Sequence, residues 1–269
     1  MPIADLGDIN LHYSEHGDGD SVLGVMGFAL DQRFWSAQIP AVTATHRFIT
    51  FDNRGLGRST GGSVQTIDEM ADDSIRLLDH LGIERTVVFG VSMGGAIAQR
   101  IAIDHPDRVS ALILGVTWAR PIEFMRRQSL LARDIIGQRG AEGLVEAALL
   151  WMFTPKFFEV GKETIDQLVT AFFAESESDA TSPEVLLAQL EAIEKHDCLA
   201  DLGRVGVPTL VLGGKADMMV PVFAAEEIAQ AIPGSRLRLF ETGHGCMIEE
   251  MQEFNREVSD FLGSLRAAG

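Results

Sequence analysis

A serine between two glycines, placed where a strand-like run changes into a helix-like one, constrains this chain more than any other feature. Residues 86–91 form a short β-branched and aromatic run, and Ser92 follows within Gly-Val-Ser-Met-Gly at 90–94. A sharp strand-to-helix turn strains the backbone, and the small residues Gly90 and Gly94 avoid clashes there. The hydroxyl then lies at a helix N-terminus, where free N–H groups favour negative charge. The pattern predicts a serine that attacks a carbonyl; the alternative is a glycine-rich turn with an incidental serine.

The composition is that of a globular protein and argues against several kinds of partner. The 269 residues suffice for one large α/β domain or two small ones, and 46% of them are hydrophobic. The net charge of −17 repels nucleic acid and anionic lipid, so we expect neither as a partner. The N-terminal residues lack the pattern of a signal peptide, and no apolar run reaches the length of a membrane span. We expect a cytoplasmic monomer or homodimer that acts on a small molecule.

Strand-like and helix-like runs alternate along most of the chain. Strand patterns fall at residues 9–14, 21–26, 47–51, 86–91, 109–115, 207–212 and 236–240, and helix patterns fall at 34–42, 67–81, 93–105, 221–232 and 253–265. The helix at 67–81 is preceded by a capping box, Thr66 to Glu69. The alternation predicts an α/β protein with a mostly parallel, twisted sheet and helices on both faces.

The alternation stops between residues 118 and 198, where every periodic segment is helical. Helix patterns lie at 121–136, 141–153, 157–173 and 183–196. Phenylalanine, tryptophan and methionine are frequent here; we expect most of them in a helix–helix core and a minority facing whatever the helices cover. The sequence therefore predicts a core of residues 1–117 and 199–269 with a helical insertion at 118–198.

Two loops supply the partners that a serine nucleophile needs. Catalytic groups of a parallel sheet gather at the carboxyl ends of its strands. The loop after strand 207–212 holds one carboxylate, Asp217, and the loop after strand 236–240 holds one histidine, His244. A histidine takes the serine proton, and a buried carboxylate fixes the histidine tautomer. We predict a triad of Ser92, Asp217 and His244; a helix-capping role for Asp217 and a surface position for His244 are the alternatives.

The other histidines and both cysteines are expected to pack or to face solvent. The histidines lie on strands or near helix ends: His12, His16, His46, His80, His105 and His196. Cys198 and Cys246 lack the close spacing of a zinc site, and the sequence leaves a disulfide between them open. We expect no metal and no cofactor.

These motifs resemble the α/β-hydrolase superfamily over nearly the whole chain. Residues 90–95 are similar to its nucleophile elbow, and residues 52–59, Asp-Asn-Arg-Gly-Leu-Gly-Arg-Ser, are similar to its D-x-R-G-x-G-x-S loop. Segments 105–109 and 213–221 also resemble it. The resemblance implies an α/β-hydrolase fold with Ser92 as nucleophile, Asp217 as acid and His244 as base. By this resemblance the insertion at 118–198 corresponds to the family's cap. Within the superfamily, the chain is most similar to the enol-lactonase and small carboxylesterase branches.

The resemblance also implies an oxyanion hole built from backbone N–H groups. We expect its donors to be Met93, which follows the nucleophile, and Phe28, which follows the second strand. Many relatives have His-Gly where this chain has Met26 and Gly27. Because the donors are backbone groups, the hole can survive this change. The change argues against a polar role for that side chain and against close kinship with the His-Gly subfamilies.

The resemblance favours hydrolysis of a small, largely apolar carboxylic ester or lactone through an acyl-enzyme. We expect Trp118, Phe124, Trp151 and Val220 to line the substrate pocket. A serine nucleophile argues against haloalkane dehalogenases, which use aspartate. The alternatives are a carbon–carbon bond hydrolase or a perhydrolase with the same triad, and a ligand receptor that keeps the triad; residues 27–35 are similar to a loop of such receptors.

Overall fold

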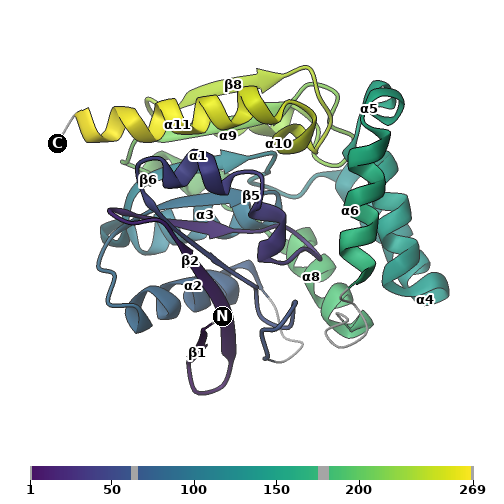
Figure 1. Cartoon of the computed structure of the whole chain (residues 1–269), viewed down its shortest axis with the longest axis horizontal. Coiled ribbons are helices and arrows are strands. Elements are labelled where there is room, and N and C mark those ends of the chain that lie inside the picture. Colours follow the sequence, from purple (N-terminus) through teal and green to yellow (C-terminus); the bar gives the residue numbers. More distant parts are fainter. Residues whose placement is uncertain (1, 62–65, 175–181, 268–269) are drawn as a thin grey trace.

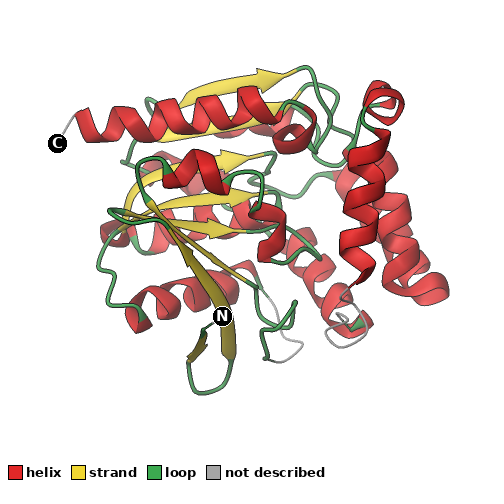
Figure 2. Ribbon diagram, in the orientation of Figure 1, coloured by secondary structure: helices red, strands yellow, loops and turns green. Residues whose placement is uncertain are grey.

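An eight-stranded sheet organises the molecule (Figures 1 and 2). The computed structural model describes residues 2–61, 66–174 and 182–267. The strands are β1 (Ile3–Asp5), β2 (Asn10–His16), β3 (Ser21–Val25), β4 (Arg47–Phe51), β5 (Thr86–Val91), β6 (Val109–Gly115), β7 (Thr209–Gly214) and β8 (Arg236–Phe240). Their spatial order is β1-β2-β4-β3-β5-β6-β7-β8. β2 runs antiparallel to β1 and β4, and the remaining pairs are parallel. The predicted, mostly parallel sheet is confirmed, and β5 lies near its centre.

Helices cover both faces of the sheet, as predicted, because the central strands are apolar on both sides. All six residues of β5 are buried. One face packs against α2 (Ile67–His80), α3 (Met93–Asp104) and α9 (Phe223–Ala231), and the other against α1 (Ile39–Thr43) and α11 (Met251–Ala267). The expected capping box begins α2: the Glu69 N–H donates to Thr66 Oγ1 at 3.1 Å, and the Thr66 N–H donates to Glu69 Oε2 at 2.8 Å. Among the described residues, no helix has the length and apolar character needed to span a membrane.

A group of helices between β6 and β7 stands at the carboxyl ends of the parallel strands (Figure 1). Its members are α4 (Glu123–Met152), α5 (Pro155–Val160), α6 (Lys162–Ala174) and α8 (Pro183–Lys195). α4 packs on α8 through an apolar cluster of Ala132, Ile136, Leu144, Leu186 and Leu190. We call these helices the cap. Its position over the strand ends sets it directly above the loops that the sequence marked as catalytic.

Two local predictions differ from the structure, each for a backbone reason. A helix over 34–42 would place Pro40 in its interior, and the chain instead forms a short 3-10 helix, Gln32–Trp35, before α1. Gly161 separates α5 from α6, where one helix over 157–173 was expected. Gly140, at φ 63° and ψ −160°, interrupts α4, as the separate helix patterns at 121–136 and 141–153 indicated. β1 and the short helix α10 (Cys246–Glu249) were not expected.

Candidate active site

Ser92 occupies a strained turn between β5 and α3. Its backbone lies at φ 57° and ψ −121°, outside the common regions for a residue with a side chain. A Cβ at Gly90 would collide with the carbonyl of Gly94, and a Cβ at Gly94 would collide with the carbonyl of Val25. The Ser92 N–H donates to the Gly115 carbonyl at 2.8 Å, and the Thr117 hydroxyl donates to the Ser92 carbonyl at 2.8 Å. Both flanking glycines are therefore needed for the turn, and neighbouring segments hold it in place.

Asp217 and His244 form a buried pair at the ends of β7 and β8. His244 Nδ1 lies 2.8 Å from Asp217 Oδ2, and the two side chains are 6% and 1% exposed. The other carboxylate oxygen, Oδ1, accepts the N–H groups of Met219 and Val220, both at 2.8 Å. The carboxylate is held on both oxygens, so it accepts the Nδ1–H of the imidazole and leaves Nε2 as a proton acceptor.

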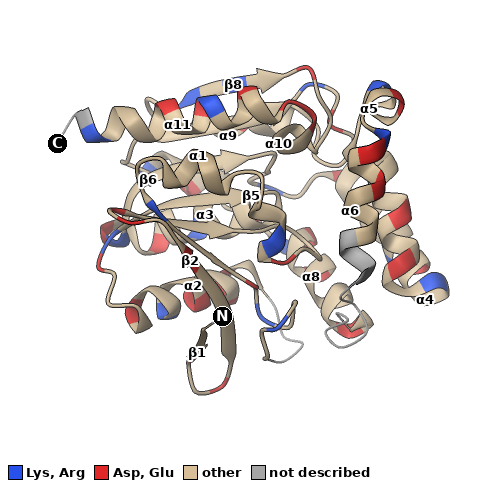
Figure 3. Ribbon diagram, viewed as in Figure 1, with Lys and Arg blue, Asp and Glu red and all other residues tan. Residues whose placement is uncertain are grey.

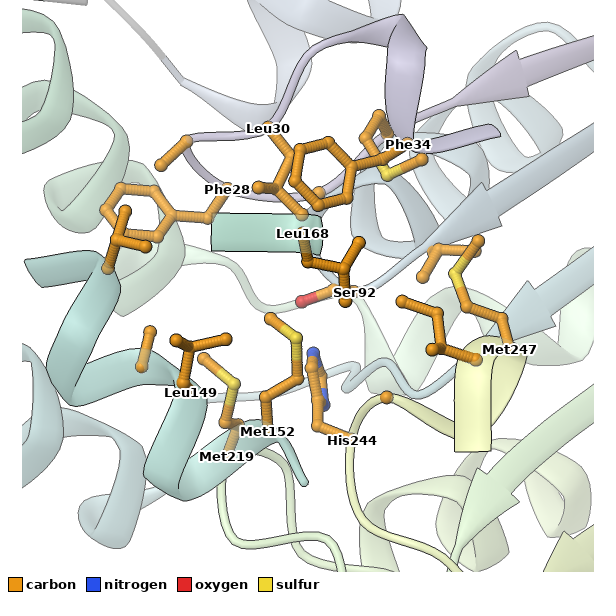
Figure 4. Close-up of a pocket in the computed structure, with 18 of the residues that line it drawn as sticks. Phe28, Leu30, Phe34, Ser92, Leu149, Met152, Leu168, Met219, His244 and Met247 are labelled. Carbon is orange, nitrogen blue, oxygen red and sulfur yellow. The ribbon is translucent and has the colours of Figure 1, made fainter. Parts of the chain in front are cut away.

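The structure brings the three predicted triad residues to one edge of the sheet. Ser92 and His244 line the same pocket, and Figure 4 shows the imidazole edge of His244 turned toward the Ser92 hydroxyl. Asp217 lies behind the imidazole and supports it from the side away from the pocket. Such an arrangement is suited to moving a proton between a hydroxyl and an imidazole whose tautomer is fixed.

The two backbone N–H groups predicted to bind an oxyanion lie near Ser92. Met93 begins α3 and Phe28 lies in the loop after β3; within the described part of the chain, neither backbone N–H has an acceptor. A Cβ at Gly27 would lie only 3.1 Å from Ser92 Cβ, so this loop passes close to the serine. The Met26 carbonyl accepts the side-chain amide of Asn53 at 3.0 Å, which anchors the loop. Met26 itself is buried and lines the pocket, in keeping with an apolar role.

The pocket above Ser92 is apolar, with a cavity of about 110 Å³. Its walls come from the loop after β3, the second half of α4, α6 and the loops that carry Asp217 and His244 (Figure 4). The apolar side chains include Phe28, Leu30, Phe34, Leu144, Val145, Ala148, Leu149, Met152, Leu168, Val169, Met219, Met247 and Ile248. None of the described lining residues is an aspartate, glutamate, lysine or arginine. Charged residues are instead found along helices such as α4 and α11 (Figure 3).

The four residues expected to line this pocket lie elsewhere. Trp118 is buried at the base of the cap, edge-on to the His196 ring. Phe124 is 43% exposed on the first turn of α4, and Val220 is buried in the core beside α9. Trp151 is adjacent to Met152, which lines the pocket, and successive residues of a helix point about 100° apart. On α4 the lining positions 144, 148 and 152 recur every four residues, and this spacing was the available signal in the sequence.

The remaining histidines and cysteines that were weighed lie outside the pocket lining. His12 Nδ1 lies 2.9 Å from Asp52 Oδ2 in a separate buried network. Burial lowers the pKa of His196 to about 4 and raises the pKa of the neighbouring Cys198 thiol to about 12. Burial also raises the pKa of Cys246 far above its usual range, so burial disfavours the thiolate form of both cysteines. Both are free, so the disulfide left open by the sequence does not form in this structure.

Comparisons with known proteins bear on the fold of the whole chain. A family model described as the alpha/beta hydrolase fold matches residues 20–250. A protein of Azorhizobium caulinodans named "Putative carbamate hydrolase RutD" is 32% identical and aligns over 98% of this chain and 99% of its own length. The enol-lactonase of Burkholderia xenovorans LB400 is 28% identical, with a TM-score of 0.87 over 97% of this chain and all of that chain. A thermophilic esterase of Thermogutta terrifontis is 30% identical, with a TM-score of 0.83 over 96% of this chain and 94% of that chain.

Proposed function

This chain belongs to the α/β-hydrolase fold family, and on that premise we propose that it is a serine hydrolase that cleaves a small, largely apolar carboxylic ester or lactone. The observation that carries the proposal is the Ser92 hydroxyl facing a His244–Asp217 pair at the floor of an apolar pocket (Figure 4). An ester and a lactone share the acyl carbon that such a serine attacks.

In the proposed reaction, Ser92 Oγ attacks the acyl carbon while His244 Nε2 takes its proton. Asp217 stabilises the imidazolium that forms, and the N–H groups of Met93 and Phe28 stabilise the oxyanion. The intermediate collapses when His244 returns the proton to the leaving alkoxide, which leaves an acyl group on Ser92. Water, deprotonated by His244, then attacks this acyl-enzyme. The bond between the acyl carbon and Ser92 Oγ breaks, His244 returns the proton to Oγ, and the acid is released.

The pocket supports a neutral, apolar acyl group of a few carbons. An apolar cavity of about 150 Å³ holds a benzene molecule, and the cavity beside Ser92 is of about 110 Å³. The enol-lactonase and esterase relatives point to the same bond types. The name of the carbamate hydrolase relative also raises a carbamate as substrate. An ionised carbamate would lose its hydration among lining residues that include no lysine or arginine, so we favour neutral esters and lactones.

A substrate panel tests the proposal. We expect multiple turnovers of p-nitrophenyl butyrate or of a small lactone, stoichiometric labelling of Ser92 by a fluorophosphonate, and loss of both in Ser92→Ala. Circular dichroism would show that this variant is folded. Turnover by folded Ser92→Ala would refute the nucleophile. A single stalled acylation would indicate a receptor. If the protein preferentially cleaved a β-diketone or a carbamate, or formed peracids, that reaction would replace ester hydrolysis as its function.

The smaller expectations stand as part of the proposal. They are a cytoplasmic monomer or homodimer, no cofactor, no nucleic-acid or membrane partner, and a catalytic core of residues 1–117 and 199–269 with a cap at 118–198. Size-exclusion chromatography with light scattering tests the oligomeric state.

A further inference from the structure

Glu249 joins the loop that carries His244 to the end of the cap helix α4. Its Oε1 accepts the N–H of Gly243, the residue before the histidine, at 2.9 Å. The same oxygen accepts the N–H of Thr154 at 3.1 Å, and Oε2 accepts the Thr154 hydroxyl at 2.6 Å. One carboxylate therefore binds a residue of the histidine loop and a residue at the junction of α4 and α5.

Main-chain contacts reinforce this junction on the other side of the histidine. The N–H of Gly245 donates to the Met152 carbonyl at 2.8 Å. A Cβ at Gly245 would collide with the Phe153 ring, and a Cβ at Gly243 would lie 2.5 Å from the Met152 carbonyl oxygen. Both neighbours of His244 are thus pressed against residues 152–154.

The hydrogen bonds that Glu249 accepts come from Gly243 and Thr154. Within the described part of the chain it forms no ion pair, and it is absent from the pocket lining. The Thr154 hydroxyl also accepts the Phe157 N–H at 3.2 Å, so its own proton is committed to Glu249. Hydrogen bonds to an ionised acceptor are stronger than those between neutral groups. The loop is thus bound on both sides of His244, at Gly243 by Glu249 and at Gly245 by the Met152 carbonyl.

We propose that Glu249 is a positioning residue that ties the placement of His244 to the cap through Thr154. The inference rests on the proposed function, because it assigns Glu249 a role in placing the base of that reaction. A misplacement of about 1 Å can cost roughly 100-fold in rate without contact to the substrate. Met152 also lines the pocket, so the junction at residues 152–154 links the position of the pocket wall to that of His244.

The test compares Glu249→Ala and Thr154→Val with Glu250→Ala. Glu250 is the next residue and has no side-chain hydrogen bond or ion pair among the described residues, so it is a matched control. We calculate kcat per active site, counted by fluorophosphonate labelling. We expect kcat to fall roughly 10- to 100-fold in Glu249→Ala, with KM within about threefold of the wild-type value. Glu249→Gln keeps a carbonyl oxygen for the N–H groups and is expected to recover most of the loss. The double variant should be no slower than the worse single variant, because the two residues act as a unit.

Hydrogen–deuterium exchange supplies a readout that does not depend on turnover. Glu249→Ala should speed exchange in peptides covering 152–157 and 241–247, whereas Glu250→Ala should not. The inference is overturned if Glu249→Ala keeps kcat within twofold of wild type. It is also overturned if the lower activity of this variant only reflects a smaller fraction of active protein molecules. It is equally overturned if the losses of the two variants simply multiply. If the wild-type protein turns over no acyl substrate, the proposed function fails, and exchange alone then decides whether Glu249 holds the loop.

Discussion

Replacement of Asp217 by asparagine should inactivate the protein while leaving its shape intact. Asp217 binds two N–H groups through Oδ1 and His244 Nδ1 through Oδ2. An asparagine that keeps its oxygen on Met219 and Val220 must present its NH₂ to the imidazole. Nδ1 then has to accept a hydrogen bond, which moves the ring proton to Nε2, where it faces Ser92. The reversed amide would instead set its NH₂ against two N–H groups.

The size of the effect follows from the loss of the general base. With the proton on Nε2, the imidazole cannot take the serine proton, and the comparable change in another triad lowers kcat about 10⁴-fold. That factor corresponds to about 5.5 kcal/mol of transition-state stabilisation. Little of it should appear as lost stability, since the volume of the side chain is unchanged.

The assay is steady-state hydrolysis of p-nitrophenyl butyrate, with thermal unfolding of each variant measured in parallel. Asp107→Asn is a suitable control because Asp107 is exposed and distant from the pocket lining. The control should match wild type in kcat and Tm. A loss of less than tenfold in Asp217→Asn would refute the reasoning and place the supporting acid elsewhere.

Two further predictions test the pocket and the core. Ala148→Leu narrows the pocket and should lower kcat/KM for p-nitrophenyl hexanoate about tenfold relative to the acetate, since each displaced methylene is worth about 0.8 kcal/mol. Ala147→Leu, on the adjacent helix face, should leave this ratio unchanged. Equal hexanoate-to-acetate ratios in the two variants would contradict the placement of Ala148 in the pocket wall. Burial lowers the pKa of His196 to about 4, so the unfolded chain binds its proton first as pH falls. The contribution of His196 to the free energy of unfolding is then fully present above about pH 6.5. It declines toward pH 4 by an amount on the order of 3 kcal/mol. Urea unfolding between pH 7 and pH 4 should show a smaller decline in His196→Gln, and identical slopes would rule this origin out.

Much of the core could be predicted from the sequence because its signals are local. The β-branched run before Ser92, the glycines at 90 and 94, and the capping box at Thr66 each specify their own conformation through contacts between near neighbours. The loops after β7 and β8 each offered one candidate of the right chemical type. Parallel topology then brings those loops to the same edge of the sheet.

The pocket walls and the junction at Glu249 could not be found in this way because they depend on tertiary packing. Large aromatic residues were expected beside the substrate, yet Trp118 fills the base of the cap and Phe124 is exposed to solvent. On α4 the cavity is lined instead by aliphatic residues and Met152, and the aromatic lining residues, Phe28 and Phe34, come from the loop after β3. The inward face of α4 is set by its packing against α8. Glu249 and Thr154 are 95 residues apart, and no local pattern indicates their contact.

The cap and the sheet loops divide the work of this molecule between separate stretches of its gene. In the proposed reaction, bond cleavage belongs to residues from the sheet loops, whereas one wall of the acyl pocket comes from a continuous insertion between β6 and β7. Transplanting that insertion between relatives should therefore exchange their preferences without rebuilding the reaction. If Glu249 positions His244 as proposed, the graft must also keep a hydroxyl residue between α4 and α5 that binds Glu249, as Thr154 does here.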